Sequence, residues 1–184
     1  MALPFSQVDV FSQEPFRGNP VAVVHDAEGL TPAAMASFAR WTNLSETTFL
    51  LAPTPQARAE GADYRLRIFT PGGELPFAGH PTLGSARAWL QSGGVPRGDR
   101  IVQECGVGLI EVRREGDELA FAAPPLRRTG PPDDATLSRA LTSLGLGIGR
   151  RRVSPPRGST TGRGGWACCS TMRGRCWGCS PTWP

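Results

Sequence analysis

The chain of 184 residues contains no lysine, two histidines and one tyrosine, and its acidic residues stop at Asp134. All twenty basic residues are arginines, so the charge divides along the chain. Residues 1–149 hold thirteen arginines against sixteen acidic residues, a net charge of −3, whereas residues 150–184 hold seven arginines and no acid, a net charge of +7. The basic character therefore belongs to the last segment, and it gives no reason to expect that the body binds nucleic acid.

Cysteine and long apolar runs are also scarce in the body. Cys105 is the only cysteine before position 150, which excludes a disulfide framework there. No stretch approaches the roughly 18 apolar residues that span a bilayer. The start lacks the positive charge and apolar run of a signal peptide. We therefore expect a soluble cytoplasmic protein that does not associate with membranes.

Residues 150–184 lack acidic residues, leucine and isoleucine, and they show no hydrophobic periodicity. Such a segment buries too little apolar surface to offset its ordering entropy. Three interpretations remain open: a segment read out of frame from a GC-rich message, a disordered arm, and a zinc or nucleic-acid module. The zinc hypothesis rests on Cys168, Cys169, Cys176 and Cys179, whose spacing lacks two CxxC knuckles. We expect a folded domain over residues 1–149 and a disordered or frame-shifted tail, with neither metal nor nucleic acid bound.

Alternation and short apolar runs predict six or seven strands and two or three helices in the body. Strands are expected at residues 7–11, 21–24, 47–51, 64–69, 101–102, 109–112 and 119–121. A threonine–proline pair at 31–32 predicts a helix that ends near Trp41, and leucine spacing predicts another over residues 133–144. A helix over residues 81–91 has one charged residue and is expected to be buried. The pattern predicts an α+β fold in which a strongly curved sheet encloses a helix.

Two segments before the buried helix carry residue types suited to chemistry. In the segment RGNP at 17–20, Gly18 permits an unusual backbone angle and Asn19 both donates and accepts hydrogen bonds, although a structural turn explains the same residues. In the segment NLSET at 43–47, Glu46 stands where a helix end meets an apolar strand. Apolar walls favour the neutral form of a carboxylate and suit it to proton transfer. An exposed loop glutamate is the alternative.

A third segment, residues 72–82, is rich in glycine and contains His80. Gly79 and His80 directly precede the expected helix, whose first residue is predicted to be Pro81. Free backbone N–H groups at a helix start attract an anion, for example a substrate carboxylate. His80 can pass a proton near neutral pH, and an ordinary capping role is the alternative.

Together these segments resemble the PhzF-like family of phenazine-biosynthesis isomerases, which shares the diaminopimelate epimerase fold. The resemblance rests on residues 5–24 (with VDVF and FRGNPVAVV), on NLSET at 43–47 and on RIFTPGGELPFAGHPTLGSA at 67–86, in the family's order and spacing. It covers residues 1 to about 125 and weakens beyond. It implies one half of a two-part fold, a curved mixed sheet wrapped round a central helix of residues 81–91.

The resemblance also implies roles for five residues. Glu46 matches the acid/base that removes a proton from a carbon of a small carboxylate substrate and helps return one elsewhere. Gly79 and His80 match the active-site turn where related epimerases carry a catalytic cysteine, so the implied isomerisation uses neither a cofactor nor a thiol. Asn19 and Gly73 match positions that line the substrate cleft.

The resemblance does not extend to the family's second half, which brings its own acidic residue and a second helix start. Neither is visible after Gly149, and proton transfer across a cleft needs groups from both sides, held with small tolerances. Two hypotheses follow: a truncated isomerase with little or no activity, and a non-catalytic half-domain that forms a homodimer or pairs with a separate second half. We expect the exposed cleft face to be apolar and to favour self-association.

Overall fold

The computed structural model describes residues 2–122, 131–143, 145, 166–168 and 177–178. The chain divides into two compact units, one of Met1–Ala122 with Trp166–Pro184 and the other of Ala123–Gly165. In the second unit, α4 (Asp134–Ser143) begins where the Asp133 carboxylate accepts a hydrogen bond from the backbone N–H of Thr136. The predicted helix over residues 133–144 is confirmed up to Ser143. Leu144 and the boundary expected at Gly149 lie outside the described residues.

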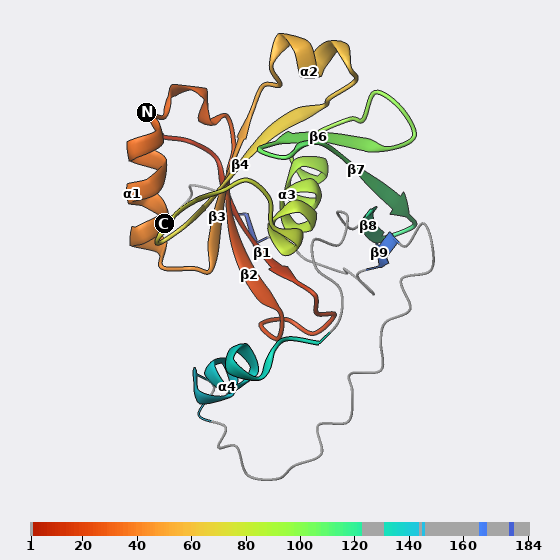
Figure 1. Cartoon of the computed structure of the whole chain (residues 1–184). Helices are drawn as coiled ribbons and strands as arrows, with labels where there is room; N and C mark the ends of the chain where they lie inside the picture. Colours follow the sequence, from red (N-terminus) through yellow and green to blue (C-terminus); the bar gives the residue numbers. More distant parts are fainter. Residues whose placement is uncertain (1, 123–130, 144, 146–165, 169–176, 179–184) are drawn as a thin grey trace. The chain divides into compact units, whose positions relative to one another are not determined.

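The first unit is built on a curved mixed sheet with α3 (Gly79–Gln91) against its inner face (Figure 1). Its strands up to Ala122 are β1 (Phe5–Val10), β2 (Asn19–Val24), β3 (Glu46–Leu51), β4 (Tyr64–Thr70), β5 (Gly73–Leu75), β6 (Ile101–Cys105), β7 (Gly108–Glu115) and β8 (Glu118–Ala122). Neighbours follow the order β1-β2-β3-β4-β6-β7-β8, with β5 paired to β4. The β2–β3 and β4–β6 pairs are parallel and the other pairs among these strands are antiparallel. The seven expected strands are confirmed, and β5 was not predicted.

Two short strands lie in the segment that was expected to be irregular. β9 (Trp166–Cys168) pairs antiparallel with β8, and β10 (Trp177–Gly178) pairs antiparallel with β1. The expectation that the tail binds no zinc stays a prediction, because Cys169, Cys176 and Cys179 lie outside the described residues.

Helix α1 (Pro32–Thr42) packs on the outer face of the sheet. The hydroxyl of Thr31 caps it by accepting a hydrogen bond from the backbone N–H of Ala34 over 3.2 Å, so the predicted helix start is confirmed. Below α1 lies a buried apolar cluster whose largest members are Met35, Phe49 and Phe69. The short α2 (Pro55–Ala59) and the 3₁₀ turn η1 (Ala27–Gly29) were not predicted.

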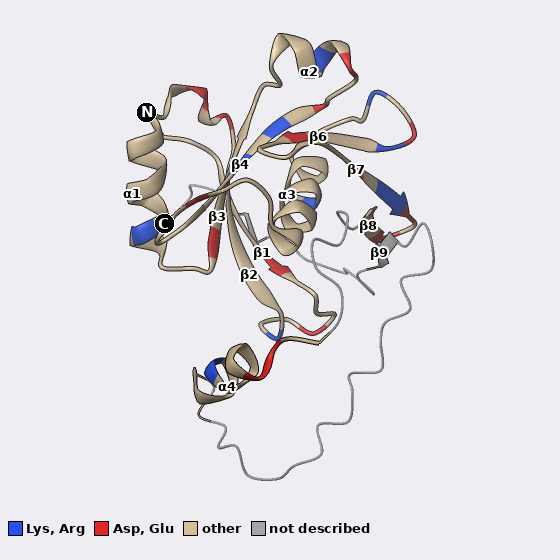
Figure 2. Ribbon diagram, in the orientation of Figure 1, with Lys and Arg blue, Asp and Glu red and all other residues tan. Residues whose placement is uncertain are grey.

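Helix α3 forms the core of the unit, as its near absence of charge predicts. Eight of its thirteen residues are buried, and Arg87 is its one charged position (Figure 2). The helix begins at Gly79 and not at Pro81, so this expected boundary is wrong. The N–H groups of the first turn have no partner within a helix, and a proline is therefore tolerated at its third position. Among the described helices, none combines the length and apolar character that a bilayer crossing requires.

Candidate active site

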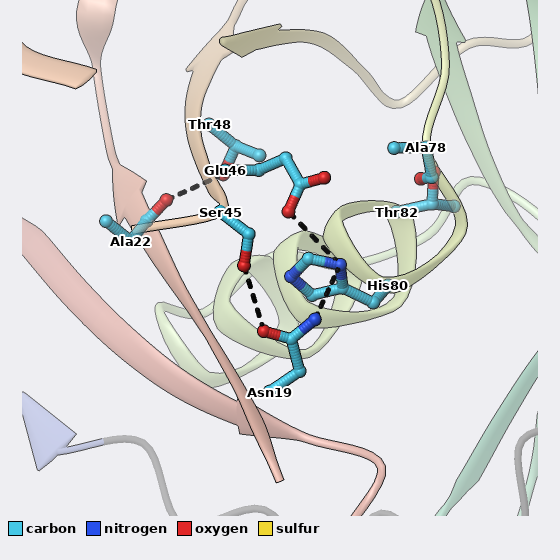
Figure 3. A network of polar contacts seen from close by, with 8 residues as sticks. All are labelled: Asn19, Ala22, Ser45, Glu46, Thr48, Ala78, His80 and Thr82. Carbon is cyan, nitrogen blue, oxygen red and sulfur yellow. Dashed lines mark hydrogen bonds and ion pairs between the residues drawn. The ribbon is translucent and has the colours of Figure 1, made fainter. Parts of the chain in front are cut away.

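Three elements bring three of the expected site residues together. Asn19 is the first residue of β2, Glu46 is the first residue of β3, and His80 is the second residue of α3. Because β2 and β3 are parallel neighbours, their first residues lie at the same end of the sheet. The N-terminal turn of α3 faces this end, and Figure 3 shows the three side chains pointing toward one another.

The imidazole of His80 is the centre of the contacts. Its Nδ1 atom lies 3.4 Å from a carboxylate oxygen of Glu46 and 3.4 Å from the side-chain nitrogen of Asn19. The hydroxyl of Ser45 donates to the side-chain oxygen of Asn19 over 3.1 Å, which turns the amide nitrogen toward the ring. The two neighbours make opposite demands on Nδ1, because the Asn19 amide nitrogen would donate to it and the Glu46 carboxylate would accept from it.

Burial controls the charge of this imidazole. His80 is 8% exposed and the Glu46 side chain is 16% exposed. Burial lowers the pKa of His80 below its usual 6.5, while the Glu46 carboxylate and a contact with the backbone carbonyl of Pro20 oppose that shift. The imidazole is therefore neutral near pH 7, the form that can accept a proton from a substrate or from its neighbouring carboxyl group.

Two buried polar atoms of this pair lack a hydrogen-bond partner in the described part of the chain. Glu46 Oε2 and His80 Nε2 are inaccessible to solvent and have no hydrogen-bond partner among the described residues. Buried polar atoms in proteins are nearly always hydrogen-bonded, so these two atoms are exceptions, although Oε2 is the oxygen that lies 3.4 Å from His80 Nδ1. Ala78 precedes α3 and makes no side-chain capping bond. Pro81 has no N–H and that of Thr82 bonds the carbonyl oxygen of Ala78, so Gly79 and His80 carry the N–H groups suited to an anion.

The two glycines expected in the site occupy different places. Gly79 begins α3, and a Cβ atom there would lie 3.1 Å from the ring of Phe121 on β8, so a small residue lets the helix start approach the sheet. Gly73 begins β5 opposite Thr70, and Phe69 lies opposite Thr47 in the next ladder. The register therefore puts Gly73 two strands from Glu46 at the same end of the sheet.

Sequence reasoning missed Ser45 and Phe11. Ser45 lies within NLSET, but its bond to Asn19 depends on a contact 26 residues away. Phe11 is 51% exposed, and its ring centroid lies 6.2 Å from that of His80. Phe11 also has a φ of 71°, which is unusual for a bulky residue and frequent where function requires a fixed geometry. Phe11 ends the VDVF motif that contributes to the family resemblance, but that resemblance gave it no role in the site.

The arrangement suits proton transfer. A carboxylate beside a neutral imidazole can take a proton from a carbon atom and return one, provided that the substrate is held within hydrogen-bond reach. Within the described part of the chain, no three His, Cys, Asp or Glu side chains cluster as ligands of a metal ion.

The pH dependence of stability should report the two buried histidines. Burial lowers the pKa of His25 as well as that of His80. Between each lowered value and 6.5, the unfolded chain binds more protons than the folded chain, so stability is lost as the pH falls through this window. We expect the urea midpoint to be lower at about pH 5.5 than at about pH 7.5. Replacing both histidines with asparagine should reduce the difference between the two urea midpoints. A urea midpoint that rises on acidification would contradict the lowered pKa of the two histidines.

Comparisons with known proteins give the family. The family model of phenazine biosynthesis-like proteins, PhzC-PhzF, matches residues 8–126. The chain therefore belongs to the PhzF family, a family of isomerases with the diaminopimelate epimerase-like fold. Both the resemblance and the fold inferred from the sequence are confirmed.

Individual relatives agree with this assignment. The chain is 46% identical over 141 residues to the trans-2,3-dihydro-3-hydroxyanthranilate isomerase of Pseudomonas aeruginosa, covering 76% of this chain and 48% of the relative. It is 45% identical over 159 residues to Antisense-enhancing sequence 1 of Schizosaccharomyces pombe, covering 83% and 52%. A PhzF-family structure from Enterococcus faecalis superposes with a TM-score of 0.58 at 30% identity, over 69% of this chain and 49% of that one. The chain thus spans about half the length of the curated relatives it matches.

Proposed function

We propose that this chain carries the acid–base wall of a PhzF-type isomerase that moves a proton on a small carboxylate substrate. Glu46 takes a proton from a substrate carbon and helps return one elsewhere, and His80 relays the proton. Asn19 holds the imidazole, while Gly73 and Gly79 line the substrate site beside the start of α3. The observation that supports this proposal is the 3.4 Å approach of His80 Nδ1 to the Glu46 carboxylate oxygen Oε2 in a largely buried pair.

The proposal includes a low activity for residues 1–184 by themselves. Residues 1–184 alone turn over a substrate slowly or not at all, because the described residues supply one wall of a cleft that needs two. The half-length match to the relatives supports this view. A carboxylate and an imidazole suffice for the transfer, so the proposal includes no cofactor. It places the chain in the cytoplasm, where a free buried thiol such as that of Cys105 stays reduced.

A binding and turnover measurement with one compound tests the proposal. The compound is trans-2,3-dihydro-3-hydroxyanthranilate, the substrate in the name of the Pseudomonas aeruginosa relative. With two histidines in the chain, NMR can follow each imidazole separately. We expect addition of the compound to shift the His80 resonances and leave those of His25 in place, with isomerisation far slower than by the full-length relative. An unchanged His80 signal would contradict the site, and turnover equal to that of the relative would contradict the need for a second wall.

A second candidate function is that of a half-domain that pairs with itself or with a separate second half. Phe11 and Phe16 favour it, because they are 51% and 81% exposed in the segment between β1 and β2, next to Asn19. Light scattering on the same sample distinguishes the candidates. A stable dimer without isomerase activity favours pairing as the function, and a monomer that binds the carboxylate favours the first candidate.

A further inference from the structure

A chain of buried hydrogen bonds joins the three elements that carry the candidate site. The hydroxyl of Ser85 on α3 donates to the hydroxyl oxygen of Thr48 on β3 over 2.9 Å. Thr48 in turn donates to the carbonyl oxygen of Ala22 on β2 over 3.1 Å, a bond drawn in Figure 3. Thr48 and Ser85 are fully buried. These bonds therefore lie one layer beneath the contacting side chains of the site.

The spacing along β3 and α3 matches. Glu46 and Thr48 are two residues apart on a strand, so their side chains point to the same face about 6.6 Å apart. His80 and Ser85 are five residues apart on a helix, which corresponds to about 7.5 Å along its axis and about 140° around it, so the match is one of axial distance only. The Glu46–His80 and Thr48–Ser85 contacts thus connect the same strand and helix at two successive levels. The deeper contact restricts how far α3 can slide along β3 or move away from it.

A second set of hydrogen bonds joins α3 to strands β4 and β6. The hydroxyl of Tyr64 donates to the side-chain oxygen of Gln103 over 3.0 Å, and the amide of Gln103 donates to the hydroxyl oxygen of Thr82 over 3.4 Å. Burial raises the pKa of Tyr64, so this hydroxyl stays a donor. These bonds hold α3 to β4 and β6 but do not set its distance from β3. The Thr48–Ser85 bond joins α3 to β3 directly.

Stability alone is a poor reason for hydroxyl groups at this place in the core. Matched apolar replacements for a buried hydrogen-bonded pair are often close to neutral for stability. Directional bonds inside a core instead select one arrangement of its elements. We propose that Thr48 and Ser85 are positioning residues whose hydrogen bond fixes the approach of His80 to Glu46. Its consequence for catalysis rests on the proposed function, but the positioning itself can be measured without a substrate.

The test measures how strongly Glu46 acts on His80. The Glu46 carboxylate raises the pKa of His80, so Glu46→Gln should lower the NMR titration midpoint of that imidazole. The other groups facing the ring, the Asn19 amide, the Pro20 carbonyl and the Phe11 ring, carry no charge and stay in place. In a Thr48→Val background we expect roughly half the shift or less, because Coulomb interactions weaken with distance and solvent access.

Two control backgrounds make the comparison specific. Thr47→Val removes the same atoms from the neighbouring residue, whose hydroxyl instead contacts Thr42 at the end of α1, and it should keep the full shift. Thr48→Ser retains the hydroxyl, so in this background Glu46→Gln should again produce the full shift of the His80 titration midpoint. If Thr48→Val does not fold, Ser85→Ala provides the same test, because it leaves Thr48 bonded to Ala22. Equal shifts in the Thr48→Val and Thr47→Val backgrounds overturn the positioning role alone, whereas no shift from Glu46→Gln in the unaltered chain overturns the pair and the proposed function with it.

Discussion

Glu46→Gln is expected to slow the exchange of a substrate C–H hydrogen with solvent by about 10²- to 10⁴-fold, the range for loss of a general acid–base group. Glutamine has nearly the same shape, but its amide cannot accept a proton from carbon at neutral pH. The contact between Asn19 and His80 does not involve the Glu46 carboxylate, so the rest of the site should persist. The measurement is deuterium incorporation into trans-2,3-dihydro-3-hydroxyanthranilate in D₂O, followed by mass spectrometry with protein in excess over substrate.

A surface variant provides the matched control for this charge change. Glu60→Gln removes one carboxylate from an exposed position where Glu60 accepts a hydrogen bond from Gln56, and it should exchange at the unaltered rate. Protein in excess is required because the proposed missing wall makes each turnover slow. If the Glu46 variant exchanges hydrogen as fast as the unaltered chain, Glu46 is not the group that takes the proton from carbon. Exchange by the unaltered chain no faster than in buffer would show that Glu46 removes no proton from carbon without groups from a second half.

Most of the fold could be predicted from local patterns, since long elements give strong signals. The uncharged residues of α3 predicted a buried helix, and the Thr31–Pro32 pair predicted the start of α1. Short elements were missed because they offer little periodicity. α2 has the same threonine–proline start but only five residues, and β5 depends on a turn in which the Thr70 hydroxyl accepts hydrogen bonds from the N–H groups of Gly72 and Gly73.

The site could be predicted only through the family resemblance. Composition and spacing left Glu46 and His80 with ordinary alternatives, because 34 residues separate them in the sequence. Their contact requires the parallel pairing of β2 with β3 and the placement of the α3 start at that end of the sheet. The Thr48–Ser85 bond is less visible still, since threonine in a strand and serine in a helix carry no signal of pairing. Tertiary contacts of this kind are set by packing, which periodicity does not encode.

Gly84→Ala is expected to destabilise the chain by about 1–3 kcal/mol, the usual cost of an overpacked core, although alanine is the better helix former by about 1 kcal/mol. A Cβ atom at this position of α3 would lie 2.4 Å from Cγ1 of Val21 and 2.9 Å from Cγ2 of Val10. Both neighbours are fully buried. Valine has a stiff χ1 angle, so relief requires the helix to move away from β1 and β2. Urea unfolding followed by tryptophan fluorescence measures the loss.

The same displacement connects this core position with the site, because β2 carries Asn19 and α3 carries His80. Gly98→Ala is the control: its Cβ atom would meet nothing within 4 Å, and its stability should be unchanged or slightly raised. Shortening the opposing side chain should relieve the clash, so Gly84→Ala combined with Val21→Ala should cost less than the two single changes together. Strict additivity, or a Gly84→Ala chain as stable as the original, would show that α3 does not pack against β1 and β2 at this distance. Packing of α3 against β1 and β2 would then not explain why His80 lies beside Asn19 and Glu46.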